Sequence, residues 1–368
     1  MVNQNEIIVS GDYSKLNEFL VSESAKKIFL VCDDSYKFLE IGKYFDNLNE
    51  FEIVKFSDFE PNPDYTSVVK AVKLYRDENC DMIIAVGGGS AMDLAKCVKL
   101  YATMDDSDDY INQPIVPNNI KLAAIPTTAG TGSEATRYAV IYYNGSKQSV
   151  TDESCIPSTV IFDASALKTL PEYQRRSTML DALCHSMESF WSVNSMDASK
   201  ELSEKAIRMI LENKDSYLSN NEQGNINMLK AANIAGKAIN ITQTTAGHAM
   251  CYKLTSLYGI AHGHAAALCV SKLLPYMVNN TEKCVDPRGK EYLDRTFDEL
   301  ACAMGCKTKD EMCEKFDNIF NSLDLSKPDS RAADIDILKN SVNPVRLKNN
   351  PIGLSLDAIE MLYRQILE

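Results

Sequence analysis

The chain has 368 residues, of which 45% are hydrophobic and 24% are charged, values typical of a folded globular protein. Its formal net charge of −13 argues against nucleic acid or an anionic membrane as partner, because both require clustered Lys and Arg. A small anionic substrate remains open, since a pocket needs only one or two local cations.

The eleven cysteines form no CxxC pair, and Cys80, Cys97, Cys251 and Cys269 lie inside apolar runs. This usage indicates reduced thiols that behave as small hydrophobic side chains. No window reaches the roughly 18 uninterrupted apolar residues of a membrane span, and the N-terminal residues lack the pattern of a signal peptide. We therefore expect a cytoplasmic protein.

The first half of the chain alternates short apolar runs with helical periods. Strands are predicted at 27–32, 51–56, 82–86, 122–125 and 160–162, and helices at 65–78 and from the segment 87–90 through Leu100. Such alternation is typical of a mostly parallel sheet covered by helices.

From Pro171 onward the apolar periods are helical, and no convincing strand is found. Helices are predicted at 181–191, 197–211, 225–243 and 293–304. We therefore divide the chain into an α/β domain at 1–168 and an all-helical domain at 169–368.

A glycine-rich segment, Gly87-Gly88-Gly89-Ser90, stands between a predicted strand and a predicted helix. Glycines let the backbone approach a phosphate, and the N-terminus of the following helix attracts its negative charge. Asp93 lies in the first turn, where it caps the helix or contacts a ribose. The alternative is a turn needed only for tight packing, since the segment is not a GxGxxG fingerprint.

A second loop, 126–134, also follows a predicted strand and contains four hydroxyl side chains and two glycines. These groups suit contacts to phosphate and ribose, and a plain turn does not need so many of them. Two such loops after neighbouring strands predict a nucleotide site.

The chain has only four histidines, His185, His248, His262 and His264. Asp181 precedes His185 by four residues, so a helix places both on one face. That pair alone is compatible with a surface interaction. Together with the other histidines it favours a site for Fe²⁺ or Zn²⁺, both of which accept mixed oxygen and nitrogen ligands.

Four segments together resemble the iron-containing (group III) alcohol dehydrogenase family over nearly the whole chain. They are GGGSAMDLAK at 87–96, IPTTAGTGSEAT at 125–136, DALCHSMESFWS at 181–192 and GHAMCYKLTSLYGIAHGHA at 247–265. The resemblance implies the dehydroquinate synthase-like fold, in which a Rossmann-like α/β domain precedes an all-helical domain. It also implies a homodimeric enzyme that uses NAD(P)(H) to interconvert a small aldehyde and a primary alcohol.

Carried over position by position, the resemblance implies specific roles. The implied metal ligands are Asp181, His185, His248 and His262, with Fe²⁺ as the ion and Zn²⁺ as the alternative. The implied cofactor contacts are Gly88, Gly89 and Ser90 at the pyrophosphate with Asp93 nearby, Thr127, Thr128 and Ser133 near adenine, ribose or nicotinamide, and Lys147 near the ribose. Asp33 falls where NAD-preferring members carry an aspartate, and a carboxylate there repels a 2′-phosphate, so NAD(H) is favoured over NADP(H).

One position departs from the family pattern. Tyr252 stands where many members have a histidine of the proton relay, so the relay runs through Tyr252, His264 or solvent. The segment around Tyr252 and SVNPVRLKNNP at 341–351 are similar to the phosphonoacetaldehyde reductase branch, which reduces phosphonoacetaldehyde to 2-hydroxyethylphosphonate. For this anionic aldehyde we expect Arg137 and Lys253 to contribute cations. The alternatives are a general short-chain alcohol or polyol dehydrogenase and, less favoured, a metal- or nucleotide-binding protein without catalysis.

Overall fold

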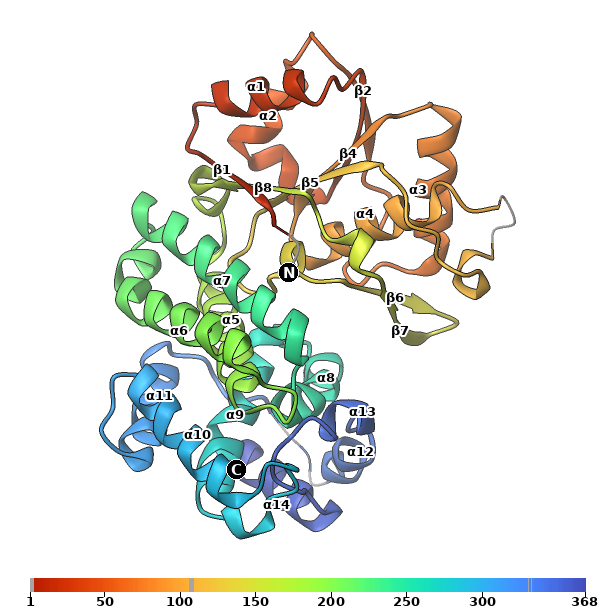
Figure 1. The fold of residues 1–368 in the computed structure, drawn as a ribbon. Helices are drawn as coiled ribbons and strands as arrows, with labels where there is room; N and C mark the ends of the chain where they lie inside the picture. Colours follow the sequence, from red (N-terminus) through yellow and green to blue (C-terminus); the bar gives the residue numbers. More distant parts are fainter. Residues whose placement is uncertain (1–2, 106–108, 330, 332) are drawn as a thin grey trace. The chain divides into compact units, whose positions relative to one another are not determined.

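The computed structural model describes residues 3–105, 109–329, 331 and 333–368. The chain forms two compact units, Met1–Leu170 with Ser219–Asn233 and Pro171–Leu218 with Ile234–Glu368 (Figure 1). The predicted boundary after residue 168 lies close to the break after Leu170. The segment Ser219–Asn233, which the prediction placed in the second domain, belongs to the first unit. Its apolar period continues without interruption along one helix, α7 (Glu222–Thr242), so no local signal marks the change of unit.

The first unit is built on a sheet of six parallel strands. In their order across the sheet the strands are β1 (Asn5–Val9), β8 (Thr159–Asp163), β5 (Lys121–Pro126), β4 (Met82–Gly87), β2 (Lys27–Cys32) and β3 (Glu52–Phe56). This architecture confirms the predicted parallel α/β fold. The prediction missed the edge strand β1, whose side chains are mostly exposed and whose apolar run is short.

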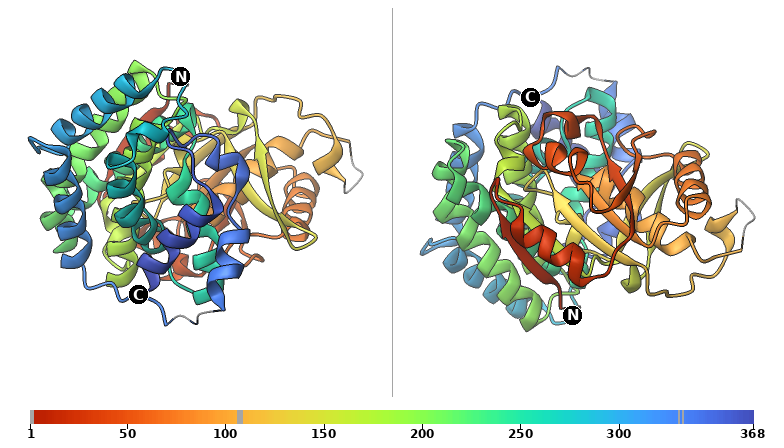
Figure 2. Two further views of the ribbon diagram at one scale, coloured as in Figure 1. Left: turned by 90° about the horizontal axis from the view of Figure 1, so that it is seen from below. Right: turned by 90° about the horizontal axis from the view of Figure 1, so that it is seen from above.

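Helices cover both faces of the sheet, as expected for parallel strands. On β2, Ile28 and Leu30 pack in the cluster that includes α1 (Ser14–Ser22) and α2 (Glu40–Asp46). Phe29 and Val31 point to the opposite face and pack in the cluster that includes α3 (Tyr65–Asp77) and α4 (Gly89–Tyr101). The red N-terminal helices lie over the strands in the right-hand view of Figure 2.

A two-stranded antiparallel hairpin, β6 (Tyr138–Tyr143) and β7 (Ser146–Thr151), was not predicted. Strand β7 is polar and almost wholly exposed, so its sequence carries little strand signal. Hydrogen bonds from one charged side chain of α4 hold the hairpin against that helix. Lys96 is fully buried and donates hydrogen bonds to Ser133 Oγ at 2.9 Å, Thr136 Oγ1 at 3.2 Å and the Tyr138 carbonyl at 2.7 Å.

The second unit is helical, and its described residues form no strand. Its helices are α5 (Glu172–Trp191), α6 (Asp197–Leu218), the end of α7, α8 (Ala246–Tyr258), α9 (His262–Val278), α10 (Lys290–Ala303), α11 (Lys309–Ser322), α12 (Asp334–Asn340), α13 (Pro344–Leu347) and α14 (Leu356–Leu367). Helix α5 packs against α6 and α9, and it is buried from Met179 through Trp191. None of the described helices is long and apolar enough to cross a lipid bilayer.

The buried Lys96 provides a test of how α4, the second loop and the hairpin are held together. Replacing Lys96 by Met keeps much of the side-chain volume but leaves three acceptors without their donor. We expect the free energy of unfolding to fall by about 1–3 kcal/mol. Urea unfolding followed by circular dichroism measures the change. Lys73→Met on the exposed face of α3 is the control and should change stability by less than about 0.5 kcal/mol; equal unfolding midpoints for the two variants would contradict the assigned role.

Candidate functional site

The structure brings together the two glycine- and hydroxyl-rich loops at the carboxyl ends of neighbouring strands. Gly87 and Pro126 are paired in register at the ends of β4 and β5, and the Thr127 N–H donates to the Gly87 carbonyl at 3.0 Å. A Cβ on Gly88 would lie 3.6 Å from Thr128 Oγ1, so the two loops pack side by side. The N-terminus of the thirteen-residue helix α4 follows directly, as an anion site requires.

Two carboxylates lie at this end of the sheet. Asp33 follows β2, accepts from the Ser35 N–H at 2.9 Å, and its Oδ2 lies 2.9 Å from where a Gly87 Cβ would be. Asp93 accepts from Ser133 Oγ at 2.7 Å and from the Val140 N–H at 3.0 Å. Burial raises the pKa of Asp93 above its usual value. Asp33 therefore lies beside the glycine loop, whereas Asp93 ties that loop's helix to the second loop and the hairpin.

The other predicted cofactor residues are distributed around these loops. Gly89 begins α4, and a Cβ there would approach the Thr131 methyl to 3.4 Å. Ser90 Oγ accepts from the Asn62 N–H at 3.0 Å. Thr127 is buried, with 5% of its surface exposed. Lys147 is an exposed residue of β7 whose charge acts on Asp93.

Three predicted metal ligands converge in the second unit. Asp181 on α5, His248 on α8 and His262 at the start of α9 each offer one donor atom, and these atoms lie within 4.8 Å of one another. His185 lies one turn beyond Asp181, with its Nδ1 4.0 Å from Asp181 Oδ2 and its ring stacked on that of His248 at 4.4 Å between centroids. The four side chains predicted from the sequence thus form one cluster.

Buried carboxylates dominate the electrostatics of this cluster. Burial alone would raise the pKa of Asp181, but His185, His248 and His262 hold it well below its usual range, so Asp181 is ionised. Burial would lower the pKa of His248, but the carboxylates of Glu188 and Asp181 raise it to about 9. A fully ionised carboxylate among imidazoles matches the donor chemistry of Fe²⁺ and Zn²⁺.

Glu188 is the functional residue that the sequence reasoning missed. Its Oε1 lies 3.0 Å from His248 Nδ1 and accepts from the His248 N–H at 2.9 Å, while its Oε2 accepts from both the N–H and the hydroxyl of Thr245. Such a carboxylate fixes the orientation and basicity of a metal-binding imidazole. The available signal was its spacing, because Glu188 follows Asp181 by seven residues and lies on the same helical face.

Two glycines permit the close approach of α8 and α9 to α5. A Cβ on Gly263 would overlap the Ser177 carbonyl oxygen and lie 2.6 Å from Asp181 Cβ. A Cβ on Gly247 would overlap Glu188 Oε1. Glycine next to His262 and His248 therefore lets the helices pass close enough for the side chains of the cluster to meet.

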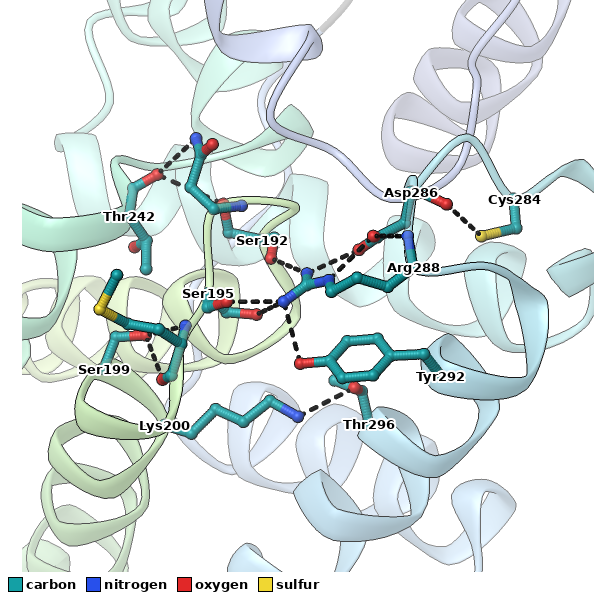
Figure 3. Close-up of polar contacts among 12 residues, drawn as sticks. Ser192, Ser195, Ser199, Lys200, Thr242, Cys284, Asp286, Arg288, Tyr292 and Thr296 are labelled. Carbon is teal, nitrogen blue, oxygen red and sulfur yellow. Dashed lines mark hydrogen bonds and ion pairs between the residues drawn. The ribbon is translucent and has the colours of Figure 1, made fainter.

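A polar network holds the C-terminal end of α5 (Figure 3). The Arg288 guanidinium donates to the Ser192 carbonyl at 2.9 Å and the Ser195 carbonyl at 2.6 Å, and it pairs with Asp286 at 2.6 Å. Ser192 Oγ in turn donates to the Thr242 carbonyl at 3.3 Å. The network joins the end of α5 to the segment that leads into α8, and so to the Thr245 groups that bind Glu188.

The two candidate relay residues are placed differently. The Tyr252 ring stacks on the His262 ring at 5.7 Å between centroids, and burial raises its pKa to about 12. His264 lies two residues beyond His262, and its ring contacts Tyr173 and Phe320 instead. Burial lowers the pKa of His264 to about 4. The structure therefore places Tyr252 beside the cluster and does not bring His264 to it.

The two predicted substrate cations also differ. Arg137 belongs to the first unit, pairs with Glu153 at 3.4 Å and lies over the Tyr138 ring. Lys253 belongs to the second unit, follows Tyr252 on α8 and is half-buried. Only Lys253 lies on the same unit as the metal-binding residues.

Comparison with known proteins identifies the class. The family model "Iron-containing alcohol dehydrogenase" matches residues 5–164, and the model "Fe-containing alcohol dehydrogenase family, C-terminal" matches residues 176–367. The chain belongs to the iron-containing alcohol dehydrogenase family, whose members are oxidoreductases.

Individual relatives cover the chain to different extents. The phosphonoacetaldehyde reductase of Streptomyces viridochromogenes is 30% identical over 313 residues, which are 80% of this chain and 78% of the relative. The aldehyde-alcohol dehydrogenase 2 of Entamoeba histolytica is 32% identical over 79% of this chain, but the match spans only 36% of that longer protein. The crystal structure of sulfoacetaldehyde reductase from Bifidobacterium kashiwanohense in complex with NAD⁺ has a TM-score of 0.89 at 24% identity, covers 100% of this chain and 98% of its own, and shows the same fold.

The buried Glu188 gives a testable consequence for metal binding. In Glu188→Gln the amide cannot hold His248 as a carboxylate does, and we expect the affinity for Zn²⁺ or Co²⁺ to fall about 10- to 100-fold. Competition with a chromogenic chelator measures the dissociation constant. Glu201→Gln on the exposed face of α6 is the matched control. Unchanged affinity in Glu188→Gln, with the fold intact, would remove Glu188 from the metal site.

Proposed function

We propose that the chain is a metal-dependent, NAD(H)-linked reductase of a small anionic aldehyde, converting phosphonoacetaldehyde to 2-hydroxyethylphosphonate. The observation that carries the proposal is the buried cluster of Asp181, His248 and His262, with Glu188 behind His248. The choice of substrate is supported by the 30% identical phosphonoacetaldehyde reductase. We further propose a cytoplasmic homodimer.

The residues that would hold the metal are Asp181, His185, His248 and His262, with Fe²⁺ favoured and Zn²⁺ as the alternative. A divalent ion bound there supplies Lewis acidity that polarises an aldehyde carbonyl. The reduced nicotinamide supplies the hydride. The chain contributes placement, because α5, α8 and α9 hold one donor atom each of Asp181, His248 and His262 within 4.8 Å of one another.

Tyr252 is the residue that we propose delivers the proton to the product oxygen. Its phenol remains protonated at neutral pH because burial raises its pKa to about 12. Its ring lies against His262, so its hydroxyl can reach a substrate held beside the metal-binding side chains. Tyr252 Oη would give its proton to the product oxygen and would regain one from solvent. His264 takes no part in this relay.

For the cofactor we propose NAD(H), bound at the carboxyl ends of β4 and β5. Gly88, Gly89 and Ser90 at the start of α4 would receive the pyrophosphate. Asp33 would accept bonds from the ribose hydroxyls and disfavour a 2′-phosphate. The remaining proposed contacts to the cofactor are Asp93, Thr127, Thr128, Ser133 and Lys147.

The aldehyde specificity tests the proposal. With Fe²⁺ reconstituted anaerobically, NADH oxidation should show a kcat/KM for phosphonoacetaldehyde at least about 100-fold above that for propanal, roughly 2.7 kcal/mol of discrimination. In Lys253→Met the KM for phosphonoacetaldehyde should rise more than the KM for propanal. Equal or better use of propanal by the wild type would favour a general short-chain alcohol dehydrogenase, and NADH binding without turnover of any aldehyde would favour a non-catalytic protein.

The glycine loop gives an independent test of the cofactor site. A methyl group on Gly88 meets only Thr128, at 3.6 Å, so Gly88→Ala should leave the free energy of unfolding within about 0.5 kcal/mol of the wild type. The same methyl group would occupy the approach of the pyrophosphate. We expect the dissociation constant for NADH, measured by nicotinamide fluorescence, to rise about tenfold or more. NADH affinity equal to the wild type would place the cofactor elsewhere.

A further inference from the structure

Tyr252 is surrounded by two segments that are distant in the sequence. Its hydroxyl forms a hydrogen bond with the side chain of Thr244, which precedes α8. The Asn349 amide donates to the Thr244 carbonyl at 3.0 Å and to Gln243 Oε1 at 3.2 Å. Asn349 is buried, and its backbone carbonyl accepts from the Val193 N–H at 3.0 Å. The segment around residue 349 is therefore held against the residue that binds the Tyr252 hydroxyl.

The short helix α13 (Pro344–Leu347) immediately precedes this anchor and packs against α8, the helix that carries Tyr252. Asn343 caps α13 by accepting from the N–H groups of Val345 at 3.0 Å and Arg346 at 3.2 Å. At the other end, the Asn349 N–H donates to the Arg346 carbonyl at 3.1 Å. Both ends of the turn that carries Arg346 are thus fixed.

Arg346 is the cation that acts on Tyr252. Its side chain is half-buried, and its positive charge opposes the rise that burial causes in the pKa of Tyr252. Tyr252 also stacks on His262, and α13, which carries Arg346, packs against the helix of Tyr252. A two-carbon aldehyde with an anionic group likewise has its carbonyl at one end, for the metal cluster, and its charge at the other end, for the guanidinium.

We propose that Arg346 binds the phosphonate group of the substrate and determines the preference of the site for an anionic aldehyde. This inference rests on the proposed function. A guanidinium presents a planar set of donors that match two oxygens of a tetrahedral oxyanion. Asp181 and Glu188 would balance the charge of a bound divalent cation, so a phosphonate needs a further cation close to the reacting carbonyl. Lys253, on the same helix as Tyr252, adds a second charge.

The test compares Arg346→Gln and Arg346→Lys with Lys348→Gln, an exposed cation of the same segment, as control. In Arg346→Gln the KM for phosphonoacetaldehyde should rise about 10- to 100-fold, as expected for the loss of a charge-assisted hydrogen-bonded pair. The KM for propanal should change much less, because propanal has no anionic group for Arg346 to bind. Arg346→Lys should retain part of the preference, because it keeps the charge without the planar donors, and Lys348→Gln should retain all of it.

Methylphosphonate provides a readout that does not depend on turnover of the anionic substrate. It should inhibit propanal reduction by the wild type competitively and lose this inhibition in Arg346→Gln. A wild-type preference for phosphonoacetaldehyde that survives in Arg346→Gln, or unchanged inhibition by methylphosphonate, would overturn the inference and leave the proposed function standing. A wild type that reduces propanal as well as phosphonoacetaldehyde would overturn the proposed substrate and the inference with it.

Discussion

The second unit depends on the burial of ionised groups along one helix, α5. Asp181 and Glu188 are 2% and 0% exposed, and an isolated carboxylate in such surroundings would cost several kcal/mol. His248 offsets the cost of both, since its Nε2 lies 3.4 Å from Asp181 and its Nδ1 lies 3.0 Å from Glu188. One imidazole thus joins two carboxylates separated by two turns of helix, and the position of α8 follows from this requirement.

The rest of the unit accommodates that contact. Helices whose side chains must meet within hydrogen-bonding distance need small residues where their backbones pass, and Gly247 and Gly263 occupy those positions. The segment between α7 and α8 must also present the N–H and hydroxyl of Thr245 to Glu188, which constrains its path. The hydrogen bonds of Ser192, Thr242 and Arg288 hold this segment and the end of α5 in place. Residues distant from the cluster therefore contribute to its geometry.

The features that were predicted correctly from the sequence are those that local residue patterns determine. Short continuous apolar runs located the central strands, period-3.6 patterns located the long helices, and the spacing of Asp181 and His185 indicated a shared helical face. Glu188 was missed because a carboxylate that binds an imidazole has no distinctive neighbours in the sequence. Proximity to His262 along the chain also does not reveal that the His264 ring contacts Tyr173 and Phe320. Ser219–Asn233 belongs to the first unit because of its tertiary packing, which local sequence patterns do not reveal.

Charge balance links the metal cluster to the choice of substrate. A divalent cation among Asp181 and Glu188 would bring the local charge of these groups close to zero, because two positive charges meet two negative ones. A neutral aldehyde needs no additional cation in the site. A phosphonate brings up to two additional negative charges, and a protein with a formal net charge of −13 has no general positive potential to attract them. Under the proposed function, cations near Tyr252 would distinguish a site for anionic aldehydes from one for neutral aldehydes, and Arg346 and Lys253 are the residues that we propose for this role.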